Sequence, residues 1–241
     1  MKPLDLNCTI EDISWLTPTI FQLSFKCTPE FDHLPGQFMS IIIPGAGPQG
    51  RDLRRAYSIA SSPGKALTQL CIRKIDGGPG TSYLGGLKPG SQFKAQAPFG
   101  HFVYKIRPGK NVCFISTGTG ISPFRSILGS KLFLENRPKN TLCLFGTTNT
   151  DEVVYDDEIK KVSDIDWVIA LSRSDKSWNG FKGRVTDFLR AHDQEIEWSN
   201  TDFYLCGNGA MIDEVKQILV SKNVQKESIL QEIYYKPKGD K

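Results

Sequence analysis

The chain has 241 residues, a formal net charge of +4, 39% hydrophobic and 23% charged residues, which suits a globular protein of two ordinary domains. No apolar run approaches the ~20 residues that a membrane helix needs, and the N-terminus lacks an apolar signal region, so a cytoplasmic location is the default expectation. Lys and Arg are scattered, which argues against nucleic-acid binding. The six cysteines show no close spacing, which disfavours a metal centre and favours free thiols.

Residues 1–106 alternate short apolar segments with turns rich in Pro and Gly. The expected strands include 19–25, 37–43, 55–59, 67–73 and 92–97. Short strands at this spacing favour an antiparallel barrel or sandwich. One short helix is expected over 81–84.

The sequence pattern changes at residue 107, after which apolar strand-like segments alternate with helical ones. The expected strands are 111–117, 141–147, 166–172, 202–207 and 229–235, and the expected helices are 124–136, 186–192 and 211–222. Alternation of this kind predicts a parallel sheet covered by helices. We therefore expect a domain of residues 1–106 and a second of residues 107–241.

The first apolar strand of the second half leads into a glycine-rich turn. The turn consists of Thr117, Gly118, Thr119 and Gly120. Ser122 is placed to cap the next helix with Pro123 as its first residue, and such a helix start presents N–H groups to a phosphate. Arg125 adds a cation nearby. Pro123 stands where the common GxGxxG fingerprint needs glycine, which disfavours an ordinary NAD site. An ordinary tight turn is the alternative.

Two later strands of this half also end in residues suited to a nucleotide. Ser172 and Arg173 follow the third strand, where a hydroxyl and a guanidinium can bind a 2′-phosphate, and Arg184 can join them. A solvated loop is the alternative. Cys206 and Gly207 end the fourth strand, where glycine permits close approach of a ligand and the cysteine is otherwise a buried structural thiol.

The first half carries a second set of cofactor-like residues. Arg55 and Tyr57 share one face of a strand, while Ser58 takes the other face or the strand end. An Arg can neutralise a pyrophosphate, a Tyr can cover an aromatic ring, and a Ser can hydrogen-bond a ring atom. Gly80, at the start of a short helix, belongs to a further anion-binding turn.

The order of these motifs over nearly the whole chain resembles the ferredoxin–NADP reductase family. The resemblance implies an antiparallel flavin-binding β-barrel followed by a parallel-sheet α/β domain that binds a nicotinamide nucleotide. It implies that flavin is held by Arg55, Ala56, Tyr57, Ser58, Cys71, Ile72, Arg73, Gly80, Thr81 and Ser82. It implies that the nicotinamide nucleotide is held by Thr117, Gly118, Thr119, Gly120, Ser122, Pro123, Ser172, Arg173, Arg184, Cys206, Gly207 and Met211.

The same resemblance assigns roles in the reaction. Ser58 faces the flavin N5 region and Cys206 lies near the nicotinamide C4, where it shapes the hydride path without acting as a covalent nucleophile. FAD is expected because most of the family uses it, and NADPH because of Ser172 and Arg173, with NADH possible. Tyr234 and Tyr235 resemble the aromatic ending that stacks on the flavin in many members, but six residues follow here, so either tyrosine or neither stacks.

Cysteine patterns typical of members with a ferredoxin-type domain or a C-terminal cluster are absent from the sequence. The electrons are therefore expected to leave for a separate ferredoxin or flavodoxin, and we expect a monomer with no membrane or nucleic-acid partner. The basic residues Arg51, Arg54, Arg55, Arg73 and Lys74 either steer an acidic carrier or merely solubilise the chain. Alternatives are a flavin reductase, the reductase component of an oxygenase, and a non-catalytic nucleotide-binding regulatory module.

Overall fold

A computed structural model describes residues 2–235, which form two compact units. The first unit contains residues 2–104 together with Ser122–Leu132, and the second contains Lys105–Ile121 together with the rest of the described chain from Phe133 onward. The polypeptide therefore passes from one unit to the other three times, after residues 104, 121 and 132.

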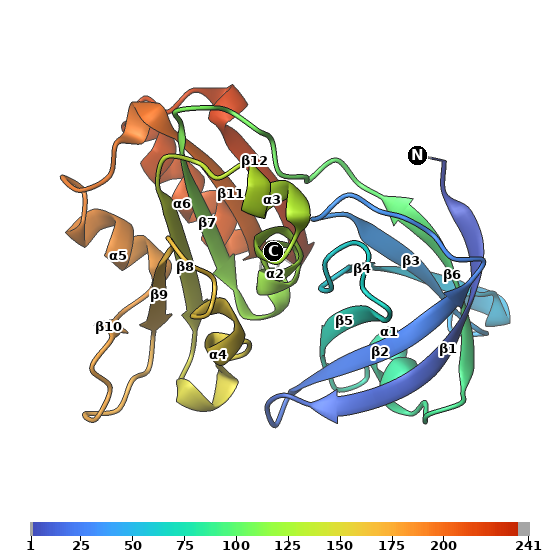
Figure 1. The fold of residues 1–241 in the computed structure, drawn as a ribbon. Helices are drawn as coiled ribbons and strands as arrows, with labels where there is room; N and C mark the ends of the chain where they lie inside the picture. The colour runs from blue at the N-terminus through green and yellow to red at the C-terminus, as the bar shows by residue number, and fades with distance from the viewer. Residues whose placement is uncertain (1, 236–241) are drawn as a thin grey trace. The chain divides into compact units, whose positions relative to one another are not determined.

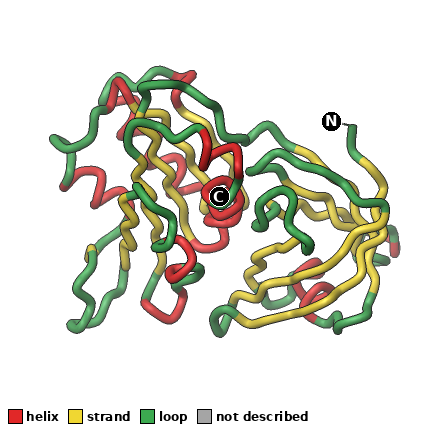
Figure 2. Tube along the Cα trace, in the orientation of Figure 1, coloured by secondary structure: helices red, strands yellow, loops and turns green. Residues whose placement is uncertain are grey.

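The first unit is built on a curled antiparallel sheet of six strands in the order β4-β3-β6-β1-β2-β5 (Figures 1 and 2). Its edge strands meet where Ile59 forms a bridge with Leu70 and Ala60 N donates to Gln69 O at 2.8 Å. The expected antiparallel barrel is thus confirmed. The strands are β1 (Leu4–Trp15), β2 (Ile20–Thr28), β3 (Phe38–Ile43), β4 (Leu53–Ser58), β5 (Thr68–Arg73) and β6 (Gln92–Phe99). The helical segments are η1 (Pro48–Gly50), α1 (Pro79–Gly85) and α2 (Ser122–Leu128).

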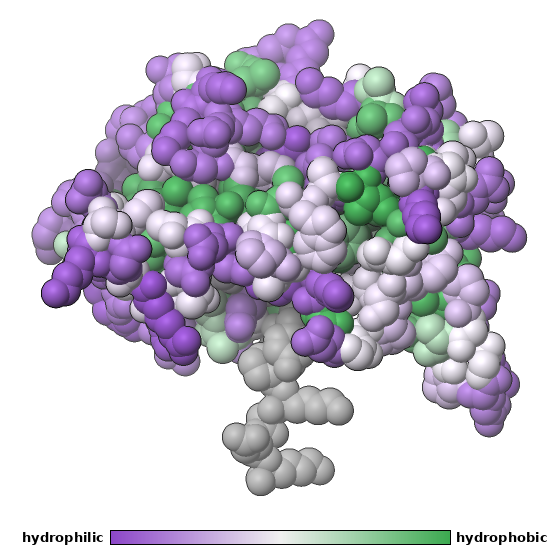
Figure 3. All heavy atoms as spheres, turned by 90° about the horizontal axis from the view of Figure 1, so that it is seen from below, coloured by the Kyte–Doolittle hydropathy of each residue, from purple (hydrophilic) through white to green (hydrophobic). Residues whose placement is uncertain are grey.

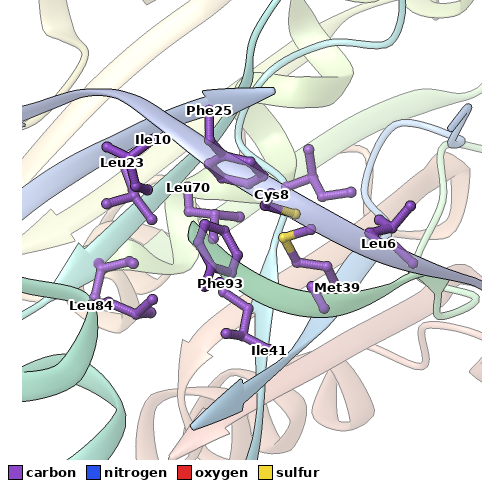
Figure 4. Packing of buried hydrophobic residues seen from close by; sticks show 14 of the residues in the cluster. Leu6, Cys8, Ile10, Leu23, Phe25, Met39, Ile41, Leu70, Leu84 and Phe93 are labelled. Atoms are coloured by element: carbon purple, nitrogen blue, oxygen red, sulfur yellow. The ribbon is translucent and has the colours of Figure 1, made fainter. Parts of the chain in front are cut away.

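Alternating side chains of these strands fill the barrel interior (Figure 4). Phe25 and Phe93 meet edge-to-face at 5.0 Å between ring centroids, which is a favourable aromatic geometry. Figure 4 shows that Cys8 points into this core toward Met39. Cys8 comes from β1, a strand absent from the sequence-based expectation, yet β1 lies between β6 and β2 near the middle of the sheet.

The second unit is a parallel sheet of six strands in the order β10-β9-β8-β7-β11-β12 (Figure 1). Its strands are β7 (Asn111–Thr117), β8 (Thr141–Thr147), β9 (Asp166–Leu171), β10 (Phe181–Lys182), β11 (Thr201–Asn208) and β12 (Ile229–Tyr235). The chain runs outward from β7 in one direction and then returns to the other side of β7 with β11. The switch point of this topology therefore lies between β7 and β11, where open α/β sheets bind ligands.

Helices cover the parallel sheet as the sequence predicts. The helical segments are η2 (Gly118–Ile121), α3 (Lys131–Glu135), η3 (Thr150–Glu152), α4 (Asp156–Ile159), α5 (Val185–Ala191), η4 (Trp198–Asn200), α6 (Gly209–Ser221) and η5 (Lys226–Ser228). In α6 the fully buried Ile212, Val215 and Leu219 recur at helical spacing, which confirms the expected amphipathic helix. The expected single helix 124–136 is wrong, because the chain leaves helical geometry at Gly129 and Ser130, between α2 and α3.

Hydrophilic side chains predominate on the face of the molecule drawn in Figure 3, with smaller hydrophobic areas among them. Within residues 2–235, no helix combines the length and apolar character needed to cross a membrane.

Candidate functional site

The start of α1 packs against the residues of β4 that the sequence assigns to a flavin. A Cβ atom added at Gly80 would lie 2.7 Å from the Tyr57 hydroxyl and 3.2 Å from Arg55 Cγ, so glycine is required for this approach. Arg55 is exposed and Tyr57 half-buried. Burial raises the pKa of Tyr57 to about 12, opposed by the positive charge of Arg55, so the phenol stays neutral at physiological pH. Ser58, the last residue of β4, is buried.

The turn before α1 is held by a buried threonine. Thr81 Oγ1 accepts a hydrogen bond from Ile75 N at 3.1 Å and lies 3.2 Å from Ile75 O. Ser82, one position further, is exposed. The structure therefore gives Thr81 a supporting role within the turn and leaves Ser82 as the exposed hydroxyl of the first helical turn.

The remaining residues assigned to the flavin lie on or beside β5. Cys71 and Ile72 are buried, so only their backbone is available to a ligand. Arg73 Nη1 donates to Thr19 Oγ1 at 2.8 Å. Arg54, on the neighbouring β4, donates to Gln96 Oε1 at 2.9 Å, and this contact makes Arg54 part of a surface polar network.

The glycine-rich turn of the second unit adopts a form that the sequence analysis did not predict. Gly118 has a left-handed backbone with φ of +54°, and the four residues of η2 form a 3-10 helix that runs directly into α2. Ser122 therefore lies inside a continuous helical run and does not cap a free helix start, and the expected N-cap role is wrong. Ser122 and Pro123 are both buried.

The ends of β7 and β11 come into close contact at the switch point. A Cβ atom added at Gly120 would collide with the backbone carbonyl of Cys206, and one at Gly207 would lie 2.6 Å from Thr117 Oγ1. Thr117 Oγ1 also accepts a hydrogen bond from Asn208 N at 3.2 Å. The structure thus brings together two segments that are far apart in the sequence and that we expected at one nicotinamide nucleotide.

Cys206 lies at the centre of this cluster and is fully buried. Burial raises the pKa of its thiol well above the usual value, the charge of Glu232 raises it further, and a hydrogen bond from the Tyr234 side chain opposes both. The Cys206 thiol is therefore neutral, in agreement with a role other than that of a nucleophile. Met211, in the first turns of α6, is half-buried and packs against the core of the second unit.

Glu232 is the residue that the sequence analysis missed in this region. It pairs in register with Cys206 across the parallel strands β11 and β12. Since alternate residues of a strand share a face, Glu232 and Tyr234 lie on the same side of β12, and that spacing is the signal that identifies them together. The side chain of Tyr235 lies outside the described part of the structure, so its expected stacking stays a prediction.

The expected 2′-phosphate residues lie at the carboxyl end of β9. Ser172 N donates to Thr147 O at 3.0 Å, Arg173 N donates to Thr148 O at 2.8 Å, and both side chains are exposed. The exposed Arg184 approaches this end because the preceding residue, Gly183, donates its N–H to Leu171 O at 2.9 Å. The three side chains are thus gathered at one end of the sheet.

Arg125 makes contacts that its position beside the glycine-rich turn did not predict. Its Nη1 donates to Ala60 O at 3.2 Å and to Gln69 Oε1 at 2.9 Å, and all three residues belong to the first unit. These bonds fasten α2 to the segment that follows the flavin motif of β4.

Two family models match the chain, the oxidoreductase FAD-binding domain over residues 7–104 and the oxidoreductase NAD-binding domain over residues 114–217. Ferredoxin–NADP reductase B of Sorangium cellulosum is 31% identical over 214 residues, which cover 84% of this chain and 86% of that protein. The phenol 2-monooxygenase reductase component of a Pseudomonas species is 28% identical over 229 residues, and the match covers 91% of this chain but only 63% of that protein.

Solved structures show the same fold. A ferredoxin–NADP reductase of Neisseria gonorrhoeae with bound FAD and NADP superposes with a TM-score of 0.84 at 19% identity, covering 98% of this chain and all of that one. The FAD-binding and NAD-binding domains, the two-part fold and the similarity to a reductase over most of its length lead to one assignment. The chain belongs to the ferredoxin–NADP reductase family of FAD- and NAD(P)-binding oxidoreductases.

Proposed function

We propose that this protein moves a hydride between NADPH and bound FAD and exchanges electrons with a separate ferredoxin or flavodoxin. The observation that carries the proposal is the junction of Thr117 and Gly120 with Cys206 and Gly207 at the switch point of the parallel sheet. Both glycines are buried and let the two segments pack directly against each other. One nucleotide bound at the switch point would therefore meet both segments.

The residues of the first unit fit an FAD. Arg55 offers an exposed guanidinium, Ser82 offers an exposed hydroxyl, and the first turn of α1 contains no acidic residue that would repel a pyrophosphate. Tyr57 presents a half-buried, neutral ring beside Arg55. These groups supply a cation, a hydroxyl and an aromatic face, the donor set that a flavin dinucleotide requires.

When bound, FAD supplies the ring system that takes up a hydride and releases electrons one at a time. The chain contributes position and electrostatics. Tyr57 covers an aromatic surface, Arg55 neutralises phosphate charge, and the buried hydroxyl of Ser58 faces the opposite side of β4 from both. Cys206 remains protonated and adds no charge, and its backbone carbonyl packs against Gly120, so we assign Cys206 a role in shaping the site around the reacting ring.

NADPH is proposed over NADH because Ser172, Arg173 and Arg184 gather exposed at the carboxyl end of β9. A guanidinium and a hydroxyl together stabilise a dianionic phosphate more than they stabilise a neutral ribose hydroxyl.

A second candidate is the reductase component of an oxygenase. Curated relatives include the reductase components of phenol 2-monooxygenase and of propane 2-monooxygenase, of whose lengths this chain spans 63% and 68%. The flavin and nucleotide sites would carry out the same hydride transfer in either case. The two candidates therefore differ in the protein that accepts the electrons, and the acceptor is what an experiment must vary.

The test is an anaerobic titration of purified protein with NADPH and then with NADH, followed by visible absorbance, with ferredoxin, flavodoxin and free flavin then added separately as acceptors. Bleaching of a bound flavin by NADPH at lower concentration than NADH, with electrons passed to a carrier, supports the proposal. Fast transfer to free flavin alone would favour a flavin reductase. A protein that binds no flavin when FAD is supplied would not be an enzyme of this kind.

A further inference from the structure

Two cysteines that are distant in sequence meet across the barrel hairpin. Cys8 of β1 and Cys27 of β2 are directly opposite in the antiparallel register, and their Sγ atoms lie 3.1 Å apart with one thiol donating a hydrogen bond to the other. Both side chains face the barrel interior, where Cys8 belongs to the buried core and Cys27 packs against it. Neither residue has a part in the proposed flavin or nucleotide sites.

The backbone at this position already matches the requirements of a disulfide. Residues directly opposite in an antiparallel pair have Cα atoms about 4.5–5.5 Å apart, inside the range of about 4.4–6.8 Å seen for disulfides. The sulfur atoms need to approach by only about 1 Å from the observed 3.1 Å to reach a bonded distance. A bond can thus form by rotation of the two side chains within the existing hairpin.

The two thiols differ in their access to solvent. Cys8 is fully buried, whereas Cys27 is half-buried and lies next to the last residue of β2. The hydrogen bond to Cys27 and burial raise the pKa of Cys8 far above its usual value, so Cys8 keeps its proton at neutral pH. An oxidant from solvent therefore reaches Cys27 first, and the buried, protonated Cys8 is the thiol that can react with the oxidised Cys27.

We propose that Cys8 and Cys27 form a site of reversible oxidation, at which hydrogen peroxide converts the two thiols into a cross-strand disulfide. The Cys27 sulfur attacks peroxide, an S–O bond forms as the O–O bond breaks, and one water leaves. The Cys8 sulfur then attacks the Cys27 sulfur, an S–S bond forms as the S–O bond breaks, and the departing hydroxyl takes the Cys8 proton as a second water. Two thiols and one peroxide thus give one disulfide and two waters.

The disulfide would join the first two strands of the barrel and close the chain between residues 8 and 27. Such a bond restricts the unfolded chain and raises the stability of the folded one. The remaining cysteines differ in access to solvent, since Cys71, Cys113, Cys143 and Cys206 are all buried whereas Cys27 is half-buried.

The experiment treats the flavin-loaded protein with hydrogen peroxide, unfolds it in iodoacetamide, and maps the peptides by mass spectrometry before and after dithiothreitol. We expect loss of two alkylatable thiols of six, a Cys8–Cys27 linked peptide that dithiothreitol removes, and a thermal midpoint that rises reversibly. In Cys27→Ser the linked peptide is lost and Cys8 stays alkylatable. In Cys8→Ala, Cys27 continues to the sulfinic acid because its resolving thiol is gone.

Cys143→Ala serves as the matched control, because it removes a buried thiol of the second unit, and the linked peptide should form at the wild-type rate. The proposal is overturned if Cys8 and Cys27 are both alkylated on unfolding after the folded wild-type protein has been treated with peroxide. It is also overturned if the sulfur bonds that appear involve other cysteines, or if Cys27→Ser loses the same two thiols as wild type. These outcomes are independent of whether the protein proves to use NADPH.

Discussion

The hydroxyl of Ser62 donates a hydrogen bond to the carbonyl of Ser126 at 3.0 Å, and the hydroxyl of Ser126 returns one to the carbonyl of Ser61 at 2.8 Å. All three residues lie within the first compact unit. Together with the Arg125 contacts, this reciprocal pair attaches α2 to the barrel segment that follows β4. The helix that follows the glycine-rich turn in sequence is thus hydrogen-bonded to the barrel segment after β4.

This attachment predicts that small changes in α2 lower barrel stability. Ser126→Ala leaves a buried carbonyl with one donor fewer and should cost about 1–3 kcal/mol in the free energy of unfolding. Gly129→Ala should cost a similar amount, because its Cβ would lie 2.6 Å from Ser62 Oγ. Urea unfolding measures both. Gly85→Ala is the control, since its Cβ would make only an ordinary 3.6 Å contact with Phe21; equal losses in all three variants would contradict the prediction.

Gly120→Ala should weaken binding of the nicotinamide nucleotide. The new Cβ would lie 2.6 Å from the backbone carbon of Cys206 and 2.7 Å from Gly207 Cα, so backbone must move at the junction of β7 and β11. We expect a rise of about tenfold or more in the NADP⁺ dissociation constant, equivalent to ~1.4 kcal/mol, by titration calorimetry. Flavin content should persist, because the substitution lies in the second unit. Unchanged NADP⁺ affinity would remove this turn from the site.

Cys206 is expected to act through shape. Because burial and Glu232 raise the pKa of its thiol, the wild-type kcat should show no inflection from this residue between about pH 7 and pH 9. Cys206→Ala should lower kcat by about 10–100-fold through misplacement of the reacting ring, with a smaller change in KM. Cys206→Ser, which keeps the shape, should retain most of the rate. If Cys206→Ser lowered kcat as much as Cys206→Ala does, a nucleophilic role of Cys206 would need to be reconsidered.

Arg173→Ala should reduce the preference for NADPH. The loss of one charge-assisted contact costs about 1.5–3 kcal/mol, or roughly 10–100-fold in kcat/KM for NADPH, with little change for NADH. Arg190→Ala is the matched control, because Arg190 lies in the same unit but is already paired with Glu214 at 2.9 Å. An undiminished preference in Arg173→Ala would exclude Arg173 from cofactor selection.

His33 should make barrel stability depend on pH. Burial lowers its pKa from the ordinary 6.5, against a backbone hydrogen bond to Ser61 and the charge of Asp32 that oppose the shift. Between the lowered value and 6.5 the unfolded chain binds more protons than the folded one, so stability falls as pH falls below 6.5 and is fully present above it. His33→Gln should flatten this slope in unfolding experiments at pH 5–7. A slope of the opposite sign would contradict the burial argument.

The parallel sheet was predictable because continuous apolar runs mark strands that are buried on both faces. The expected range 111–117 coincides with β7 and 141–147 with β8. β1 was missed because charged residues such as Glu11 and Asp12 interrupt its apolar alternation. Since its register was unknown, the meeting of Cys8 with Cys27 was unpredictable.

In the candidate site, too, the residue types could be identified from local sequence patterns, whereas the contacts between distant segments could not. The sequence identified Gly120 and Cys206 separately. Their close approach, which leaves no room for a Cβ atom at Gly120, depends on β7 and β11 being neighbours. Arg125 was expected near phosphate because it follows a glycine-rich turn, and no local pattern reveals that its guanidinium bonds to Ala60 and Gln69. Glu232 became visible as a site residue only through its register with Cys206.

The polypeptide passes between its two units three times, so neither unit is formed by one continuous stretch of sequence. A fragment that ended at residue 106 would lack α2 and leave the carbonyls of Ala60 and Ser61 without the donors that Arg125 and Ser126 supply. The complementary fragment would carry that helix with no barrel to receive it. A cut of the chain at residue 106 would therefore separate groups that are hydrogen-bonded to each other within the first unit.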